Sequence, residues 1–221
     1  MIKLEKSEVM GWEHVIRGMR NPKNSWEKSD SLMSTASIEE GWAELGHNDY
    51  DLMTRLRNAG TDHRKFMRMI TVYVDITAPL YWWKEFDTYK VGTVANSCST
   101  MHKIHTKEFT SGDFSHEHLF NSLGNGMYKD QLLLTIGCLN YARKLFLETK
   151  DKKYWWQMIQ LLPSSYNQKR TVMLNYEVLA NMYKSRKNHK LDEWREFCEW
   201  IESLPYSELI TGEERSEDEQ G

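Results

Sequence analysis

The sequence predicts an α+β fold that is mostly helical and contains a small sheet. Two observations lead to this fold class. Apolar residues recur every three or four positions through much of the chain, most clearly in its C-terminal half, which is typical of amphipathic helices. Residues 70–76 instead alternate apolar and polar side chains, which is the pattern of a half-buried strand.

The N-terminal part of the chain is expected to form three helices. Residues 8–19 carry apolar side chains at helical spacing, and the helix stops before Pro22. Residues 37–42 begin with the Ser and Glu spacing of a capping box, which predicts a short helix. Asp49 is a candidate N-cap for the third helix, and Gly60 is its stop signal.

After the strand the chain becomes helical again. Thr77 as N-cap opens a predicted aromatic-rich helix over residues 80–89, and Gly92 ends that segment. Residues 111–126 are expected to form a loop with a short helix near 117–122. Four further helices are predicted, over residues 130–147, 153–161, 169–186 and 192–203.

Length and charge indicate one domain with an acidic extension. The chain has 221 residues and a formal net charge of −3. Residues 213–221 hold five acidic residues and one Arg, so they contribute −4 and leave about +1 for the rest. A basic nucleic-acid-binding surface is therefore not expected. We expect a single domain over residues 1–211 and a disordered acidic tail over 212–221.

Composition also predicts where the protein resides. No apolar run approaches the roughly 18 residues of a membrane helix, and the N-terminus has no apolar signal segment. The cysteines are Cys98, Cys138 and Cys198, which are far apart, odd in number and without a CxxC pair. A disulfide scaffold is not expected, and a reducing cytoplasm without membrane contact is the predicted compartment.

Two patterns have both a structural and a functional interpretation. Cys98, His102 and His105 have a spacing that metal ligands can adopt, but zinc requires a fourth ligand, so no metal is expected. The aromatic triplets at residues 81–83 and 154–156 suit a buried core or a subunit interface better than stacking on a flavin or a base.

Residues 70–101 and 162–186 resemble the flavin-dependent thymidylate synthases. The order of features is similar: a helix, a Gly, a strand, an Ala-Pro pair and an aromatic helix that leads into a polar signature. The family signature reads Arg-His-Arg, then Ser, Asn-Glu, Ser and Arg-Tyr. In this register Lys90 and Thr93 are conservative replacements, and Cys98 stands at the second Ser. The other signature positions differ from the family and are occupied by Thr88, Tyr89, Ala95, Asn96, Thr100 and Met101.

The C-terminal half resembles the family more closely. A Leu-Pro pair at residues 162–163 is followed at the family's spacing by Asn175, Asn181 and Arg186, without a gap. The His-Ala-Gln that follows in the family is Lys-Leu-Asp here, at residues 190–192. The similarity covers about residues 49–201. Arg186 also has a purely structural interpretation, because a helix C-terminus attracts a cation.

The resemblance implies a homotetramer with sites assembled between subunits, in which a flavin (FAD) stacks over deoxyuridine monophosphate (dUMP). It implies that Arg186, with Lys90 and Thr93, binds the pyrimidine nucleotide. It also implies flavin contacts from Asn175 and Asn181, with Tyr89 at a flavin position of the signature. Without the Arg-His-Arg cluster, however, the chain lacks several donors for the flavin phosphates, and Lys90 replaces a fork by a point charge.

Two functions therefore compete. In the first, the chain is an enzyme, a transferase that modifies C5 of a pyrimidine deoxynucleotide, with Arg186 orienting the substrate and Cys98 as a nucleophile activated by Lys103 or His102. In the second, the chain kept the fold but lost the flavin chemistry, and it binds a nucleotide or a partner without catalysis. A small buried hydrophobic residue is the plain alternative for Cys98. A purely structural oligomer is a third hypothesis, which does not account for the retained Asn and Arg residues.

Overall fold

The computed structural model describes residues 2–32, 44–120 and 127–212. The helix expected at residues 37–42 and the acidic tail beyond Gly212 lie outside these ranges. The strands are β1 (Lys3–Met10), β2 (Thr71–Pro79), β3 (Val94–Ser97) and β4 (Asn167–Asn175). The α-helices are α1 (Trp12–Arg20), α3 (His47–Asn58), α4 (Leu80–Phe86), α5 (Met127–Thr149), α6 (Lys152–Leu161), α7 (Tyr176–Arg186), α8 (Asp192–Glu202) and α9 (Glu208–Thr211). Short 3₁₀ helices are η1 (Asn21–Lys23), η2 (Trp26–Lys28), η3 (Arg64–Arg68) and η4 (Ser111–Asp113).

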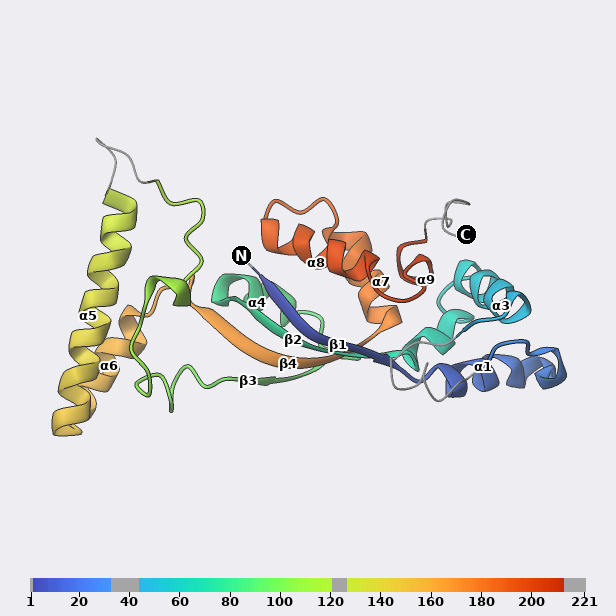
Figure 1. The fold of residues 1–221 in the computed structure, drawn as a ribbon, viewed down its shortest axis with the longest axis horizontal. Coiled ribbons are helices and arrows are strands. Elements are labelled where there is room, and N and C mark those ends of the chain that lie inside the picture. Colours follow the sequence, from blue (N-terminus) through green and yellow to red (C-terminus); the bar gives the residue numbers. More distant parts are fainter. Residues whose placement is uncertain (1, 33–43, 121–126, 213–221) are drawn as a thin grey trace. The chain divides into compact units, whose positions relative to one another are not determined.

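The four strands form one antiparallel sheet in the order β1-β2-β4-β3 (Figure 1). This small sheet, among the many helices of the described chain, confirms the predicted α+β class. The chain divides into two compact units, and each of the four strands contributes residues to both. Unit 1 comprises Met1–Lys3, Ile76–Thr88 and Asn96–Arg170, and unit 2 comprises Leu4–Asp75, Tyr89–Ala95 and Thr171–Gly221.

Strand β2 forms where the alternating pattern predicts it. Val72 and Ile76 are 0% exposed, whereas Tyr73 between them is 37% exposed. Each fully buried aliphatic side chain contributes about 1.5–3 kcal/mol of hydrophobic free energy, so the alternation fixes which face of the strand is buried. The strand is longer than predicted, because it continues through Pro79. Thr77 therefore lies inside β2 and does not cap α4, whose N-cap is Pro79.

Two predicted helices begin later than expected, because a strand occupies the first part of each predicted range. Asn167–Asn175 form β4, so only Tyr176–Arg186 of the helix expected at 169–186 is helical. Within β4, Val172 and Leu174 are buried, whereas Thr171 is exposed and Met173 is half-buried, which is the period of two that a strand requires. The N-terminal helix begins at Trp12, because residues 8–10 belong to β1.

Three smaller expectations also need correction. Asp49 does not cap α3, because the helix begins at His47 and its N-cap is Gly46. The helix expected over residues 80–89 ends at Phe86, so Tyr89 lies beyond it. Instead of a helix near 117–122, the described part of that stretch contains a turn. By contrast, the helices predicted at 130–147, 153–161 and 192–203 are confirmed as α5, α6 and α8, with small differences at their ends.

Unit 1 is built around the packing of α5 on α6, which lie side by side in Figure 1. Asn140 of α5 forms two hydrogen bonds of 2.8 Å with the backbone of Phe109, which ties the preceding loop to the helix. The buried cluster in this unit comprises Ile104, Phe109, Phe114, Leu132, Ile136, Leu139, Ala142 and Met158. This cluster accounts for the buried side of α5.

The aromatic triplet at residues 81–83 belongs to the core of unit 1. Trp82 and Trp83 are at most 1% exposed, and the indole of Trp83 donates to the carbonyl of Gln168 at 3.0 Å. Arg170 stacks on the ring of Trp83 at 4.0 Å and pairs with Asp87 at 2.7 Å. The triplet at 154–156 is more open, because Trp156 is 43% exposed. The structural interpretation is therefore correct for the first triplet.

Candidate functional site

Arg186 ends helix α7 in unit 2, and aromatic side chains fix its guanidinium group. Its Nε donates to the hydroxyl of Tyr89 at 3.0 Å. The guanidinium carbon lies 4.7 Å from the ring centre of Trp194 and 5.6 Å from that of Tyr89. Trp194 is 0% exposed, so it offers a rigid surface for this cation–π contact. The predicted nucleotide-binding Arg and the predicted flavin-contacting Tyr are thus direct neighbours.

The segment from Tyr89 to Thr93 runs alongside helix α7. Tyr89 contacts Arg186 at the C-terminal end of the helix, and Gly92 lies near its N-terminal end. Gly92 has a φ of +80°, and a Cβ placed on it would lie 2.7 Å from Nδ2 of Asn175 and 2.8 Å from Cγ2 of Val178. Only Gly allows both this backbone conformation and this close approach. The hydroxyl of Thr93 donates to the carbonyl of Tyr89, which closes the turn. Tyr89, Thr93 and Asn175 therefore all lie along one helix with Arg186.

Asn175 has a structural role in the described chain. Its Oδ1 accepts a hydrogen bond of 3.0 Å from the backbone amide of Val178 and so caps α7. Replacing such a cap by Ala typically costs about 1 kcal/mol. Lys90 is exposed in the same segment, next to the Tyr89 that contacts Arg186.

Asn181 belongs to a second cluster on α7. Its side-chain oxygen accepts from Nη2 of Arg64 at 3.3 Å, and Nε of Arg64 reaches Glu177 at 3.3 Å. Arg68 also pairs with Glu177. Arg186 follows Asn181 by five residues, which turns its side chain about 140° around the helix axis. The structure therefore separates Asn181 from the Arg186–Tyr89 pair.

The charges in this second cluster are unequal. Glu177 is one carboxylate in direct contact with two guanidinium groups, and the hydrogen bond from Arg68, together with Arg64, holds the pKa of Glu177 below its usual value. Arg64 is half-buried and Arg68 is 54% exposed at its side chain. Two guanidinium groups against one carboxylate suit an anionic ligand, because their forks match phosphate oxygens. The sequence gives no signal for this cluster, because η3 and α7 are about a hundred residues apart.

Cys98 belongs to unit 1, whereas the other predicted site residues all belong to unit 2. It lines a pocket of about 230 Å³ together with Thr77, Lys107, Asp113 and Tyr166. Cys98 is exposed, so the interpretation as a small buried hydrophobic residue is wrong. Its backbone amide donates to Lys169 at 2.9 Å, and its carbonyl accepts from Gln168 at 2.7 Å, so β4 positions it.

A charged pair faces the same pocket. Lys107 pairs with Asp113, and this hydrogen bond raises the pKa of Lys107. Burial raises the pKa of the Tyr166 phenol. Lys107 and Lys169, and not the expected Lys103 or His102, are therefore the basic residues that line the pocket with Cys98. Sequence reasoning missed Lys107 because it is nine residues beyond Cys98 and lies in an irregular loop.

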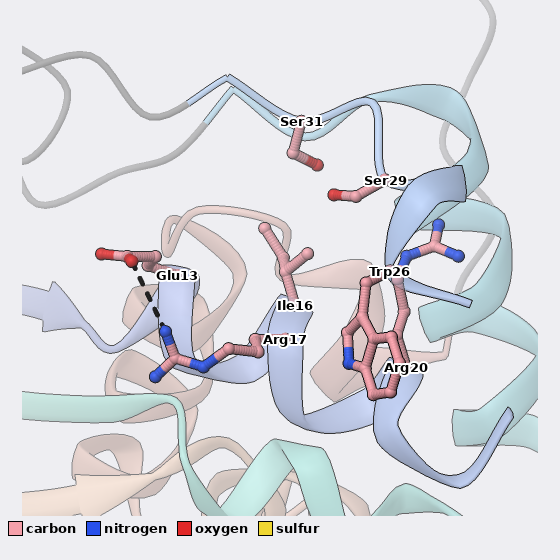
Figure 2. A pocket seen from close by; sticks show the side chains of 7 residues that line it. All are labelled: Glu13, Ile16, Arg17, Arg20, Trp26, Ser29 and Ser31. Atoms are coloured by element: carbon pink, nitrogen blue, oxygen red, sulfur yellow. Dashed lines mark ion pairs between the residues drawn. The ribbon is translucent and has the colours of Figure 1, made fainter. Parts of the chain in front are cut away.

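A further pocket of unit 2, of about 360 Å³, has no predicted site residue (Figure 2). Figure 2 shows Glu13 and Arg17 paired on one side of it and Trp26 on the other. Beside it, Arg20 pairs with the fully buried Asp49 at 2.6 Å. Burial raises the pKa of Asp49, but hydrogen bonds from Ser31, Ser29 and Arg20 outweigh it and hold that pKa below its ordinary value. This network organises the start of α3.

The described residues were also compared with the requirements of a metal site and of a membrane-spanning helix. No group of three or more His, Cys, Asp or Glu side chains is arranged to hold a metal ion there. No described helix is long and apolar enough to cross a membrane.

Comparisons with known proteins identify the fold. No family model matches the sequence, and no curated protein matches it. Among solved structures, thymidylate synthase X (ThyX) from Helicobacter pylori with FAD and dUMP matches at a TM-score of 0.67 and 15% identity, over 96% of this chain and 98% of that one. A second structure, of the flavin-dependent thymidylate synthase ThyX from the same organism complexed with FAD and dUMP, matches at 0.66 and 16% identity, over 94% and 99%.

The UMP/dUMP methylase PolB from Streptomyces cacaoi, bound with 5-Br dUMP, matches at a TM-score of 0.57 and 12% identity, over 96% of this chain and 94% of that one. At identities of 12–16% these matches show a shared fold. The chain thus has the fold of the flavin-dependent thymidylate synthases, as its sequence resemblance implied.

Proposed function

We propose that this protein binds a pyrimidine deoxynucleotide of the dUMP type, and that Arg186 is the residue that recognises it. The observation that carries the proposal is the fixed guanidinium of Arg186, held by the Tyr89 hydroxyl at 3.0 Å and by the face of Trp194 at 4.7 Å. A preoriented planar donor suits phosphate or uracil oxygens, because little side-chain freedom is lost when the ligand binds. The solved structures of similar fold, which were determined with dUMP or 5-Br dUMP, support this ligand class.

Lys90 and Thr93 are proposed to assist Arg186. Both belong to the short segment that begins at Tyr89, so along the chain they are close to the residue whose hydroxyl contacts Arg186. Lys90 is exposed and supplies a point charge, whereas the Thr93 hydroxyl closes the turn. By the family resemblance, the nucleotide cleft forms between subunits of a homotetramer in the cytoplasm.

FAD is proposed as the cofactor, and the donor set of unit 2 fits part of it. FAD carries a pyrophosphate, and the guanidinium of Arg64 contacts the Asn181 amide and shares Glu177 with the guanidinium of Arg68. We expect Asn181 and these arginines to hold the anionic part of FAD, with Asn175 and Tyr89 as further contacts. Bound flavin would supply hydride chemistry to the reaction. No metal is included in the proposal.

For the catalytic version of the function, Cys98 is the proposed nucleophile toward the pyrimidine ring. Cys98 is exposed and lines a pocket of about 230 Å³, so its thiol is accessible to a ligand. The competing version is a nucleotide-binding protein without turnover. The variant Cys98→Ser distinguishes these two versions. If the protein is an enzyme, the wild type should turn over dUMP and the variant should not. If the protein only binds the nucleotide, neither protein should turn over dUMP.

Thermal unfolding tests the binding proposal. A ligand that binds only the folded state raises the melting temperature, so dUMP should stabilise the wild-type protein. Arg186→Lys keeps the charge but loses the fork, so most of this rise should disappear. Arg195→Lys is the matched control, because Arg195 is an exposed arginine of α8 that pairs with Asp192. An equal response of the Arg186 and Arg195 variants would refute the assignment of Arg186. No response of the wild-type protein would refute nucleotide binding.

A further inference from the structure

The outward face of α5 carries an apolar surface that the described residues leave uncovered. Leu133 is 57% exposed, and Leu134 and Tyr141 are each 65% exposed. With Asp130, Gly137 and Cys138 they line a shallow hollow along the helix. The opposite side of α5 is buried in the core of unit 1. Large apolar side chains that gather on one exposed helix face mark a protein contact.

Gly137 lies at the middle of this face. A Cβ placed on it would meet no atom within 4 Å, so the lack of a side chain is not required by the packing of this subunit. A Gly at the middle of an exposed face allows another helix to approach closely. Such a Gly otherwise weakens the helix by about 0.5–1 kcal/mol relative to Ala.

The side chains are arranged symmetrically around Gly137. Asp130 lies seven residues before it, and Lys144 lies seven residues after it. Leu133 lies four residues before it, and Tyr141 four residues after it. At 3.6 residues per turn all four side chains lie within about 40° of the direction of Gly137, so they share one face. Asp130 and Lys144 are both exposed.

We propose that α5 packs antiparallel against α5 of a second copy of this chain, with the two-fold axis at Gly137. In that arrangement, residues equally far before and after Gly137 face each other. Asp130 of each copy then lies opposite Lys144 of the other, and Leu133 opposite Tyr141. A parallel pair would bring like charges together, Asp130 to Asp130 and Lys144 to Lys144, so the charges select the antiparallel register.

A second copy fits this surface better than an unrelated partner, because the pattern is complementary to itself. A two-fold interface uses the same patch on both subunits. The α5 patch satisfies this condition, because an acidic residue before Gly137 matches a basic residue equally far after it. This pairing makes the exposed face of α5 one of the subunit interfaces of the oligomer proposed above. It does not depend on the nucleotide site.

Charge reversal tests the pairing by analytical ultracentrifugation. Asp130→Lys and Lys144→Asp each create two like-charge contacts per interface, so each should weaken self-association by tenfold or more. The double variant restores opposite charges and should recover it. Lys152→Asp changes an exposed lysine of α6 and is the control, with wild-type association expected. Single variants that associate as the wild type does would overturn the α5 interface.

Cysteine cross-linking tests the register. In a background with Cys98→Ser and Cys138→Ser, Gly137→Cys should form an intermolecular disulfide on mild oxidation, because the two Gly137 positions meet at the axis. Glu148→Cys is the matched control on the same helix. It lies about 16 Å from Gly137 along the helix, so the two copies of this position would be about 33 Å apart and should not cross-link. Cross-linking through Glu148→Cys alone would overturn the antiparallel register.

These outcomes separate the proposals. A monomeric wild-type protein at micromolar concentration would refute both the oligomer and the α5 interface. An oligomer that ignores the charge reversals would refute only the α5 interface. In both cases the response of the melting temperature to dUMP tests the nucleotide site on its own.

Discussion

Arg186 and Tyr89 lie 97 residues apart in the chain and are joined by a hydrogen bond of 3.0 Å from Nε to the phenol oxygen. This bond fixes one edge of the guanidinium group, and the ring of Trp194 lies against its face at 4.7 Å. At Tyr89 the family signature has a His. The Tyr thus supports a neighbouring Arg that the chain has kept.

Removing the Tyr89 hydroxyl should loosen Arg186. Tyr89→Phe keeps the ring but loses the hydrogen bond, so we expect a loss of about 1 kcal/mol in unfolding free energy. We also expect several-fold weaker binding of dUMP, because the guanidinium is less well oriented. Calorimetric titration and urea unfolding measure the two effects.

Tyr183→Phe is the matched control for that experiment. Tyr183 is also in α7, and its hydroxyl donates to Glu202 at 2.7 Å. It should lower stability by a similar amount and leave the affinity for dUMP unchanged. Equal losses of affinity in both variants would mean that Tyr89 acts only through general stability.

Gly92 should tolerate no side chain. Gly92→Ala has to adopt a φ of +80° and places a Cβ 2.7 Å from Nδ2 of Asn175. Gly60→Ala is the control, because Gly60 has a φ of +104° but no atom within 4 Å of its Cβ position. The control should cost about 1 kcal/mol for backbone strain alone, and Gly92→Ala should cost distinctly more. Equal costs in urea unfolding would show that the contact with Asn175 is unimportant.

The buried Arg20–Asp49 pair should contribute more to stability than an exposed ion pair does. Asp49→Asn leaves Arg20 buried without its counter-charge, which typically costs about 3–5 kcal/mol. Asp51→Asn is the control, because its pair with Arg55 is exposed and should contribute less than about 1 kcal/mol. Urea unfolding at neutral pH distinguishes the two.

The pH dependence of stability follows from the sign of the Asp49 shift. Its pKa is lower in the folded protein than the ordinary value of 3.8, so the unfolded state binds the proton more readily. The stabilisation is therefore complete above pH 3.8 and is lost as the pH falls through the folded pKa. The unfolding free energy of Asp49→Asn should vary less with pH in that acid range. Parallel curves for wild type and variant would contradict the assignment.

The thiols should differ in reactivity. Cys98 is exposed, whereas Cys198 is 3% exposed, and burial raises its pKa to about 12. We expect a maleimide to label Cys98 in the folded protein much faster than Cys198, and to label both in urea. Mass spectrometry of the digested protein gives the rates. Slow labelling of Cys98 would argue against its proposed role as a nucleophile.

The sequence predicted the elements whose burial follows a simple period. β2 and the helices α5, α6 and α8 each bury apolar side chains at the spacing of a strand or a helix, so spacing alone locates them. β1 was missed because Val9 is its one buried residue within the strand. β4 was missed because Lys169 and Arg170 interrupt the alternation of apolar and polar residues. The helical spacing of α7, which follows directly, was therefore assigned to residues of the strand as well.

The sequence predicted those residues of the candidate site whose spacing along the chain matches that of the family. The spacing of Asn175, Asn181 and Arg186 pointed to α7, and three of the predicted residues do lie along it with Tyr89. The contacts of Arg64 with Glu177 and of Lys107 with Asp113 depend on tertiary folding or on an irregular loop. Neither has a sequence period, so the partners of Asn181 and Cys98 could not be found in advance.

The most direct test of the nucleotide proposal is a crystal structure of this protein soaked with 5-Br dUMP, with the bromine located by its anomalous signal. We expect one nucleotide per subunit, with oxygen atoms of its phosphate or base within hydrogen-bond distance of the Arg186 guanidinium. Crystals of Arg186→Lys soaked at the same concentration should show no bromine peak. A nucleotide bound away from Arg186, or an unchanged peak in the variant, would refute Arg186 as the residue that recognises the nucleotide.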